Sequence, residues 1–333
     1  MATHRMLRSL LTALLATSVT HGSAAHAAGL RERIEARMAK RASRFIQETL
    51  KPAAARRSGD RLLALVGAAT KSPRATKAAL LLDAELSVAF AFAFKEEQEP
   101  EQALALYRRA RDDARRALGP AWKRLERAAP GELPRLLEAL HAGATAPVFW
   151  AAFAEALSAN LARDGASLVR VPRLKQTLTW VARRDSRIFN AGPHLALGLL
   201  AASFPASGGG DLDEARRHFE RVDELTEERW LIGKLLRARS YSVALQLPPL
   251  GQRGPEARAR AQKTAWDDFT SNLEHIVHAS DKLWPSRGLY NAVAKEKALK
   301  MLRSADDWML PPPGARNRWQ SPEKPGRNDE AGE

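Results

Sequence analysis

Cysteine is the most informative absence from this chain of 333 residues, because the chain contains none. Disulfide bridges, thiolate zinc sites, iron–sulfur clusters, cysteine nucleophiles and lipid attachment to a cysteine are therefore excluded. Aromatic residues make up only 6% of the chain, and β-branched residues are sparse. This composition disfavours a fold built on strands and favours helices.

Long apolar runs are also missing, since no segment reaches the roughly 18 uncharged apolar residues of a membrane-spanning helix. The apolar run from Leu10 to Val19 is too short to cross a bilayer. It follows Arg5 and Arg8 and precedes Ala25-His26-Ala27, an A-x-A cleavage signal. These features predict a secretory signal peptide over residues 1–27 and a periplasmic mature protein with no transmembrane segment. An uncleaved membrane anchor is the alternative.

Acidic residues are too few to balance the basic ones. The chain has 53 Lys and Arg against 38 Asp and Glu, a net charge of +15. Such an excess can indicate nucleic-acid binding, but an exported protein seldom meets nucleic acid. The cations are spread over several predicted helices with acidic residues between them. We therefore predict solvated charged faces and no nucleic-acid partner, while attraction to an anionic partner or envelope surface stays open.

Alanine is abundant, with 62 residues, and apolar positions recur at helical spacing along most of the chain. The alternation over Ala89–Phe94 would suit a strand, but it is embedded in good helix formers and has no partner strand. The predicted helices span residues 61–69, 75–95, 99–118, 121–128, 133–141, 147–163, 172–184, 192–204, 212–225, 228–245, 256–280 and 290–308. The sequence thus predicts an all-α protein.

The domain organisation follows from these assignments. After the signal peptide, residues 28–57 are predicted to form a basic N-terminal helix with apolar residues at helical spacing. Residues 58–309 form the helical domain. The Pro-rich segment 310–333 is predicted to be a disordered tail.

A repeat-like pattern occurs in two predicted helices, where a small residue, an aromatic and a small residue follow at spacings of four and three. The residues are Ala103, Tyr107 and Ala110 in one helix and Ala215, Phe219 and Val222 in the other. Leu197 and Gly198 supply the Leu-Gly pair of a preceding helix. Small residues of this kind admit a neighbouring backbone, and the aromatic ring fills the gap. The two sites are separated by far more than one repeat of roughly 34 residues. We therefore predict a degenerate tetratricopeptide-like bundle of helical hairpins, of the α-solenoid type, with a plain helical core as the alternative.

Turn residues mark the start of the second of these helices. Gly209 and Gly210 end a Gly/Ser-rich loop, and Asp211 stands three residues before Glu214. This spacing predicts a capping box with Asp211 as the N-cap.

Aromatic residues are the candidates for a ligand site. Phe149, Trp150 and Phe153 form a stripe on one predicted helix, and Trp230 opens another. His194, next to Pro193 at a helix start, could face the same cleft, but we favour the alternative that it caps a neighbouring group. Aromatic side chains that line a cleft would hold an apolar molecule, although packing in the core is the commoner role of such residues.

No reactive centre is evident in the sequence. His275 and His278 share a helix face, but no carboxylate pattern accompanies them. Gly208–Gly210 lacks the Lys-Ser/Thr of a phosphate loop, and no G-x-S-x-G motif is present. We predict no catalytic residues, no metal and no cofactor, and hence a protein that is not an enzyme.

Several stretches together resemble the T-component family of tripartite ATP-independent periplasmic (TRAP) transporters. They are Gly192–Ser203 with Pro193, Leu197 and Gly198; Gly209–Glu220 with Gly210, Asp211, Ala215 and Phe219; Lys234, Arg237 and Tyr241; Asn291–Lys295; and Phe149-Trp150 with Ala152. The resemblance covers about residues 58–309.

This resemblance implies an all-helical homo-oligomer, a trimeric ring with a central opening. It implies that the protein docks the periplasmic solute-binding protein of the transporter and binds or channels a small apolar ligand. A general tetratricopeptide-type adaptor for protein–protein interaction in envelope assembly is the alternative function.

Overall fold

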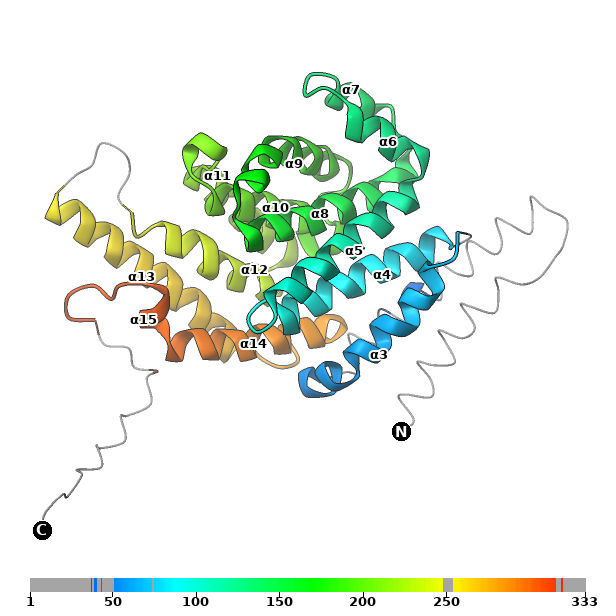
Figure 1. Cartoon of the computed structure of the whole chain (residues 1–333). Coiled ribbons are helices and arrows are strands. Elements are labelled where there is room, and N and C mark those ends of the chain that lie inside the picture. Colours follow the sequence, from blue (N-terminus) through cyan, green and yellow to red (C-terminus); the bar gives the residue numbers. More distant parts are fainter. Residues whose placement is uncertain are drawn as a thin grey trace, which may run out of the picture.

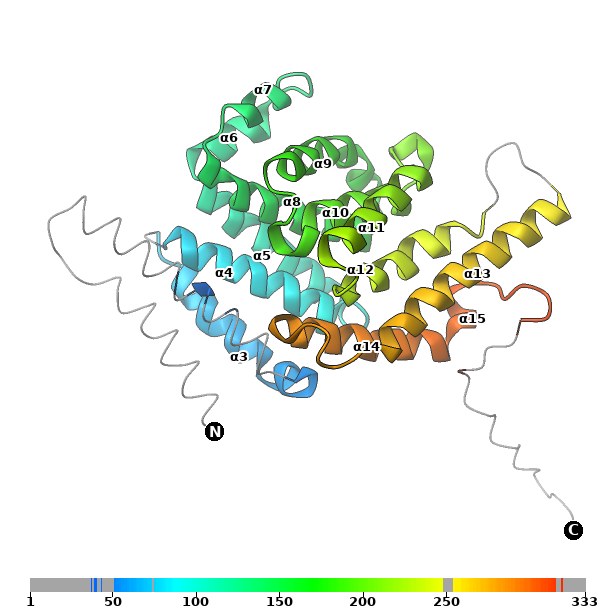
Figure 2. The ribbon, with the colours of Figure 1, turned by 180° about the vertical axis from the view of Figure 1, so that it is seen from behind.

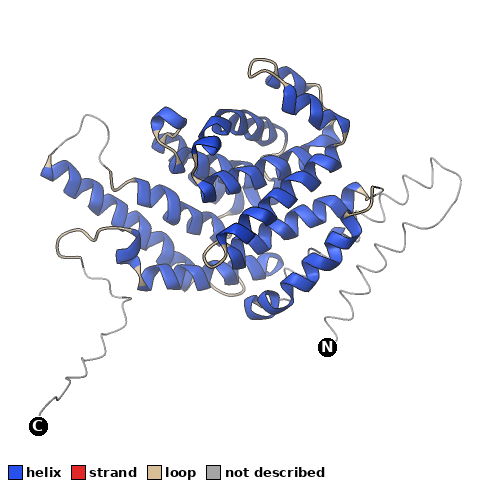
Figure 3. Ribbon diagram, in the orientation of Figure 1, coloured by secondary structure: helices blue, strands red, loops and turns tan. Residues whose placement is uncertain are grey.

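The computed structural model describes residues 37, 39, 40, 43, 51–73, 75–247, 254–315 and 319. Every regular element among these residues is helical (Figure 3), so the predicted all-α fold is confirmed. The predicted signal peptide (1–27), most of the predicted basic helix (28–57) and most of the predicted tail (310–333) lie outside the described residues.

The α-helices follow one another along the chain with short connections. They are α3 (Pro52–Thr70), α4 (Lys77–Phe90), α5 (Pro100–Leu118), α6 (Pro120–Arg127), α7 (Leu133–Glu138), α8 (Thr145–Ala162), α9 (Gly165–Arg184), α10 (Ile188–Ser203), α11 (Leu212–Thr226), α12 (Leu231–Leu236), α13 (Pro255–His278), α14 (Gly288–Arg303) and α15 (Ala305–Trp308). Two π-helical segments, η1 (Ala91–Lys95) and η4 (Arg237–Ser242), extend α4 and α12. Short 3₁₀ turns occur at η2 (Ala142–Ala144), η3 (Ala206–Gly208) and η5 (Pro285–Arg287).

Helix α8 is the centre of the packing. It contacts α4, α5, α9 and α10, and its apolar residues Phe149, Ala151 and Ala154 are fully buried. Alanine on α8 keeps the neighbouring helices close. By contrast, α6 and α7 project from one end of the body (Figures 1 and 2).

The C-terminal part of the chain returns to the N-terminal part, and α14 lies beside α3 (Figure 1). Leu289 and Val293 of α14 enter one apolar cluster with residues of α3 and α4. Lys297 and Lys300 both donate to Glu97, at 2.7 and 2.6 Å. These contacts join segments that are about 200 residues apart in sequence.

Most predicted helices are present, but some boundaries were wrong. Helix α9 begins at Gly165 and not at Pro172, because the Asp164 carboxylate accepts a hydrogen bond from Ser167 N at 2.8 Å and caps the helix. Helix α3 begins at Pro52 instead of Arg61, with the proline at its first position, where no N–H is needed. Its residues 57 and 58 are continuous helix across the predicted domain boundary.

Two other predicted helices are interrupted. The helix expected over 228–245 begins only at Leu231, because Glu227 and Glu228 have left-handed backbones (φ 52° and 55°) that end α11. The helix expected over 290–308 is divided into α14 and α15 at Ser304. The segment Ala89–Phe94 is helical, as expected, and its last four residues belong to the π-helical turn η1.

The repeat-like motif residues are buried. Ala103, Tyr107 and Ala110 are 0% exposed, and Ala215 and Phe219 are at most 1% exposed. A Cβ on Gly198 would lie 3.2 Å from the Phe219 ring, so α10 and α11 make the close approach expected of this spacing. A tetratricopeptide-like repeat as such stays a prediction.

The loop before α11 forms half of the predicted capping box. Asp211 Oδ1 accepts from Glu214 N at 2.9 Å, as expected. The reciprocal bond is not formed, because Glu214 bonds to Lys175 on α9 and the Asp211 N–H donates to Ala201 O at 2.9 Å. A capped helix start therefore also anchors α11 to α9.

Candidate ligand-binding site

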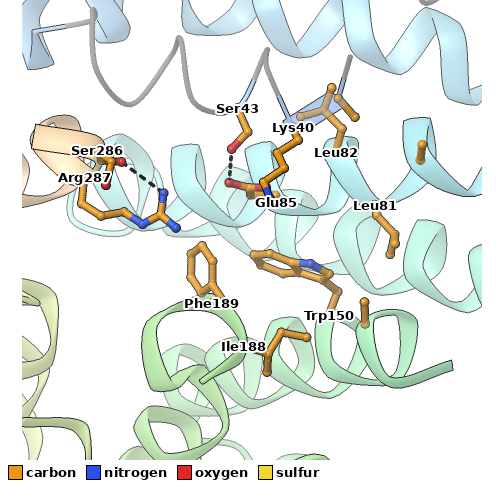
Figure 4. A pocket seen from close by; sticks show the side chains of 13 residues that line it. Lys40, Ser43, Leu81, Leu82, Glu85, Trp150, Ile188, Phe189, Ser286 and Arg287 are labelled. Atoms are coloured by element: carbon orange, nitrogen blue, oxygen red, sulfur yellow. Dashed lines mark hydrogen bonds between the residues drawn. The ribbon is translucent and has the colours of Figure 1, made fainter. Parts of the chain in front are cut away.

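A cavity of about 460 Å³ lies where α4, α8, the start of α10 and η5 meet (Figure 4). Trp150 of α8 and Phe189 of α10 lie side by side along it. Leu81 and Leu82 of α4 add apolar surface, and residues 39, 40 and 43 also line the cavity. This volume is within the range of small-molecule sites.

One end of the cavity is polar. Ser43 Oγ donates to Glu85 Oε1 at 2.6 Å. Burial raises the pKa of Glu85, while the Ser43 hydrogen bond and the positive charge of Arg287 act in the opposite direction. Arg287 is held by two acceptors, with Nε donating to Asn190 Oδ1 at 2.9 Å and Nη1 donating to Ser286 O at 3.1 Å. The cavity therefore combines an apolar aromatic wall with an ionic end.

Phe189 is the centre of an aromatic cluster. Its ring centroid lies 4.7 Å from that of Trp150 and 5.8 Å from that of Phe153. On the other side it lies 6.0 Å from Trp230 and 5.8 Å from Tyr290, both in edge-on contact. Each such pair adds about 0.5–1.5 kcal/mol beyond area burial, so this ring joins α8, α10, the N-cap of α12 and α14.

The backbone at Phe189 is strained. Phe189, Asn190 and Ala191 have φ values of 46°, 57° and 60° in the left-handed region. Each such residue costs roughly 1–2 kcal/mol, and clustered strain of this kind is a feature of ligand sites. The right-handed part of α10 then begins at Gly192, where a Cβ would lie only 2.5 Å from Phe149. Glycine thus allows the helix start to press against the aromatic stripe, and the preceding turn directs Phe189 into the cavity.

A second, deeper hollow of about 30 Å³ lies on the other side of Phe189. The described residues that line it are all apolar or aromatic, among them Phe153, Trp230 and Tyr290. Phe189 lines both spaces, so its ring stands between the outer cavity and the inner hollow.

We compared the sequence with models of known protein families. A family model described as TRAP transporter T-component matches residues 37–247, more than half of the chain. The chain belongs to the TRAP transporter T-component family. Among curated proteins, none matches the chain. The matched region includes Trp150 and Phe189 but ends before Arg287.

In this T-component, the aromatic candidates separate into two environments. Trp150 lines the outer cavity, whereas Phe153 and Trp230 line the inner hollow. Phe149 is fully buried and stacks on Phe153 with ring centroids 5.1 Å apart, but it lines neither space.

His194 lies apart from these aromatics. Its Nδ1 is 3.1 Å from Nδ1 of His218 on α11. Burial, and after it the positive charge that His218 can carry, lowers the pKa of His194 to about 4. Within the described part of the T-component, no group of three or more His, Asp or Glu side chains could share a metal ion.

Asn291 and Lys295, which lie beyond the matched region 37–247, hold α14 in place. The Asn291 carboxamide accepts from Leu231 N at 3.2 Å and donates to Arg229 O at 3.0 Å. Lys295 Nζ donates to Asp281 at 2.6 Å. These residues support the site from behind, next to Tyr290.

Most residues of the site were not predicted from the sequence, among them Phe189, Glu85 and Arg287. The turn residues Asn190 and Gly192 before Pro193 were the only available signal for Phe189, because they mark a sharp bend. No local pattern connects Glu85 with Arg287, since only the folded chain brings both to the same cavity.

Proposed function

We propose that this T-component is a non-enzymatic, exported scaffold that docks the periplasmic solute-binding protein of a TRAP transporter and holds a small apolar ligand. The family match is the observation that carries the docking role. The aromatic cavity with its strained Phe189 turn supports the ligand-binding role.

The export route and assembly complete this proposal. Residues 1–27 act as the cleavable signal peptide, and the mature protein works in the periplasm. None of the helices in the described ranges is long and apolar enough to cross a membrane. The protein forms a homo-oligomer, a trimer with a central opening, whose tetratricopeptide-like hairpins offer the docking surface.

Ligand binding uses the two spaces on either side of Phe189. A ligand enters the outer cavity against Trp150, and a swing of the Phe189 ring connects this cavity with the inner hollow at Trp230. The apolar lining of both spaces favours an apolar ligand through burial of its surface.

Docking is tested by cross-linking in the native envelope, followed by affinity capture and mass determination of the bound species. We expect the extracytoplasmic solute-binding protein to be captured with an oligomer of the T-component. A monodisperse monomer that retains no envelope protein would reject the docking role. Capture of assembly factors with no transporter component would instead favour the general adaptor.

Ligand binding is tested separately with the neutral fluorescent dye N-phenylnaphthylamine. We expect dye binding to the wild-type protein and its loss in Ala146→Phe, which fills the cavity. Ala142→Phe is the matched control, because Ala142 is exposed and does not line the cavity. Equal dye binding by both variants would reject the cavity as the binding site.

A further inference from the structure

We propose that the outer cavity selects an apolar ligand with a carboxylate head, which is bound by Arg287 while its chain lies against Trp150 and Phe189. This inference rests on the ligand-binding part of the proposed function and adds the chemical class of the ligand.

Arg287 is built to receive an anion. Two of its nitrogens are already engaged, by Asn190 at 2.9 Å and by the Ser286 carbonyl at 3.1 Å. Its Nη2 has no hydrogen-bond partner within the part of the chain that the structure describes. Figure 4 shows the guanidinium reaching from η5 toward the cavity that it lines. The two bonds fix the orientation of the guanidinium, so a ligand that bonds to Nη2 loses little side-chain entropy.

The hydrogen bond from Arg287 to Asn190 also links the residue that would bind the ligand's head group to the residues that would bind its apolar chain. Asn190 is the central residue of the left-handed turn and directly follows Phe189. The same turn therefore positions the aromatic ring that meets the apolar chain and the amide that orients the cation.

The charges that line the cavity favour one negative charge on the ligand. Among the described lining residues, Lys40 and Arg287 are the cations and Glu85 is the acid, which leaves a surplus of one positive charge there. Glu85 is bonded to Ser43 and makes no hydrogen bond with Arg287 among the described residues. A carboxylate matches this surplus, whereas a phosphate monoester near pH 7 carries nearly two charges.

An amine head is disfavoured by the same arrangement. It would need Glu85 as its partner, but one oxygen of this carboxylate already accepts from Ser43. It would also face the like charges of Arg287 and Lys40. The ligand-binding preference should therefore run from carboxylate through alcohol to amine.

The test uses three probes with the same chain, namely octanoate, octanol and octylamine, and measures their affinities by calorimetry near pH 7. We expect octanoate to bind about tenfold more tightly than octanol, the contribution of one hydrogen bond to a charged group. Octylamine should bind least. Octyl phosphate is included as a fourth probe, and tighter binding of it than of octanoate would overturn the carboxylate assignment.

Three variants test whether Arg287 causes the preference for octanoate over octanol. Arg287→Gln should reduce the ratio of octanoate to octanol affinity from about tenfold to about one, and octanol binding that persists in this variant shows that the cavity is still formed. Arg258→Gln removes the same charge from an exposed site on α13 and should keep the tenfold ratio. Glu85→Gln should raise octanoate affinity severalfold.

The inference is overturned if wild-type protein binds octanol as tightly as octanoate, or if Arg287→Gln keeps the tenfold ratio. If either result were found and N-phenylnaphthylamine still bound, the apolar site would be supported. Only the proposed preference for a carboxylate head group would then be rejected. Absence of binding by every probe would reject both the head group and the ligand-binding role. Capture of the solute-binding protein would still support docking in that case.

Discussion

At the scale of single residues, the close approach of backbone and side-chain atoms determines the stability of several positions. Glycines at helix ends let neighbouring backbones and rings come nearer than any Cβ would permit. Gly210 is the clearest example, because the atom that it approaches belongs to the backbone. Close packing also affects His194, since burial, and after it the neighbouring His218, lowers the pKa of its imidazole.

Gly210→Ala should destabilise the protein by about 2–3 kcal/mol. A Cβ at this position would lie 1.7 Å from the carbonyl oxygen of Phe204, and the backbone of the loop must move to relieve the clash. Urea unfolding followed by circular dichroism measures the change. Gly131→Ala is the control, because no atom lies within 4 Å of its Cβ position; equal losses in both variants would contradict this explanation.

The stability of the protein should fall as the pH drops from about 6.5 to 4, with a contribution from His194. Its pKa is lowered to about 4 in the folded protein, below the unfolded value of 6.5. The unfolded state therefore binds more protons in this window, and acid favours unfolding.

His194→Gln should remove roughly 1 kcal/mol of this loss between pH 7 and pH 5, a figure reduced for the partial solvent exposure of the ring. Unfolding curves at the two pH values measure the difference. His141→Gln, at an exposed position, should lose as much stability as the wild type. A His194→Gln protein with the wild-type pH dependence would show that another group is responsible.

At the scale of elements, the two π-helical segments meet at a buried ion pair. Arg239 of η4 donates from Nη1 to Glu96 Oε2 at 2.7 Å, and Glu96 directly follows η1. Tyr107 of α5 donates to the other Glu96 oxygen at 2.5 Å. The Glu96 side chain is only 2% exposed. One ionic cluster therefore locks the N-terminal hairpin of α4 and α5 to the C-terminal half of the chain.

Arg239→Met should destabilise the protein by about 3 kcal/mol, because it leaves Glu96 buried without its counter-charge. The double variant Arg239→Met/Glu96→Gln should recover part of this loss, since the unpaired charge is then removed. Thermal and urea unfolding of both variants measure the two effects. A double variant less stable than the single one would show that the Glu96 carboxylate stabilises the protein mainly through its bond to Tyr107 and not through the ion pair.

At the scale of the whole molecule, the outer cavity is formed by segments that are distant in sequence. Residue 43, α4, α8, the start of α10 and η5 all contribute to it. A ligand in this cavity would contact segments from both the N-terminal and the C-terminal half of the chain, so its binding would be coupled to global stability.

Saturation with octanoate should therefore raise the melting temperature of the entire protein in one cooperative transition. At a ligand concentration of 100 times the Kd, the stabilisation is about 2.7 kcal/mol. Differential scanning calorimetry measures it, with Ala146→Phe as the variant whose melting temperature should not respond. A shift of equal size in this variant would place the bound ligand elsewhere.

Much of the secondary structure could be predicted from the sequence because its signals are local. The spacing of Leu212, Ala215 and Phe219 after Asp211 predicted α11 correctly. Predicted helix boundaries were wrong where a side chain capped the helix at another residue. Asp164 caps α9 well before Pro172, where the sequence predicted the start. The candidate site was only partly predictable: Trp150 belongs to it, His194 does not, and Phe189 was overlooked.

The sequence by itself determined the helical class and the family of this protein, because helix periodicity and family motifs are read within short windows of the chain. Only the tertiary structure decided which aromatic side chains line a cavity, since burial on α8 affects nearly every face of the helix. It also brought Glu85 and Arg287 to one end of that cavity. Their meeting depends on the return of the last helices to the first ones, a long-range packing event that leaves no trace in local spacing.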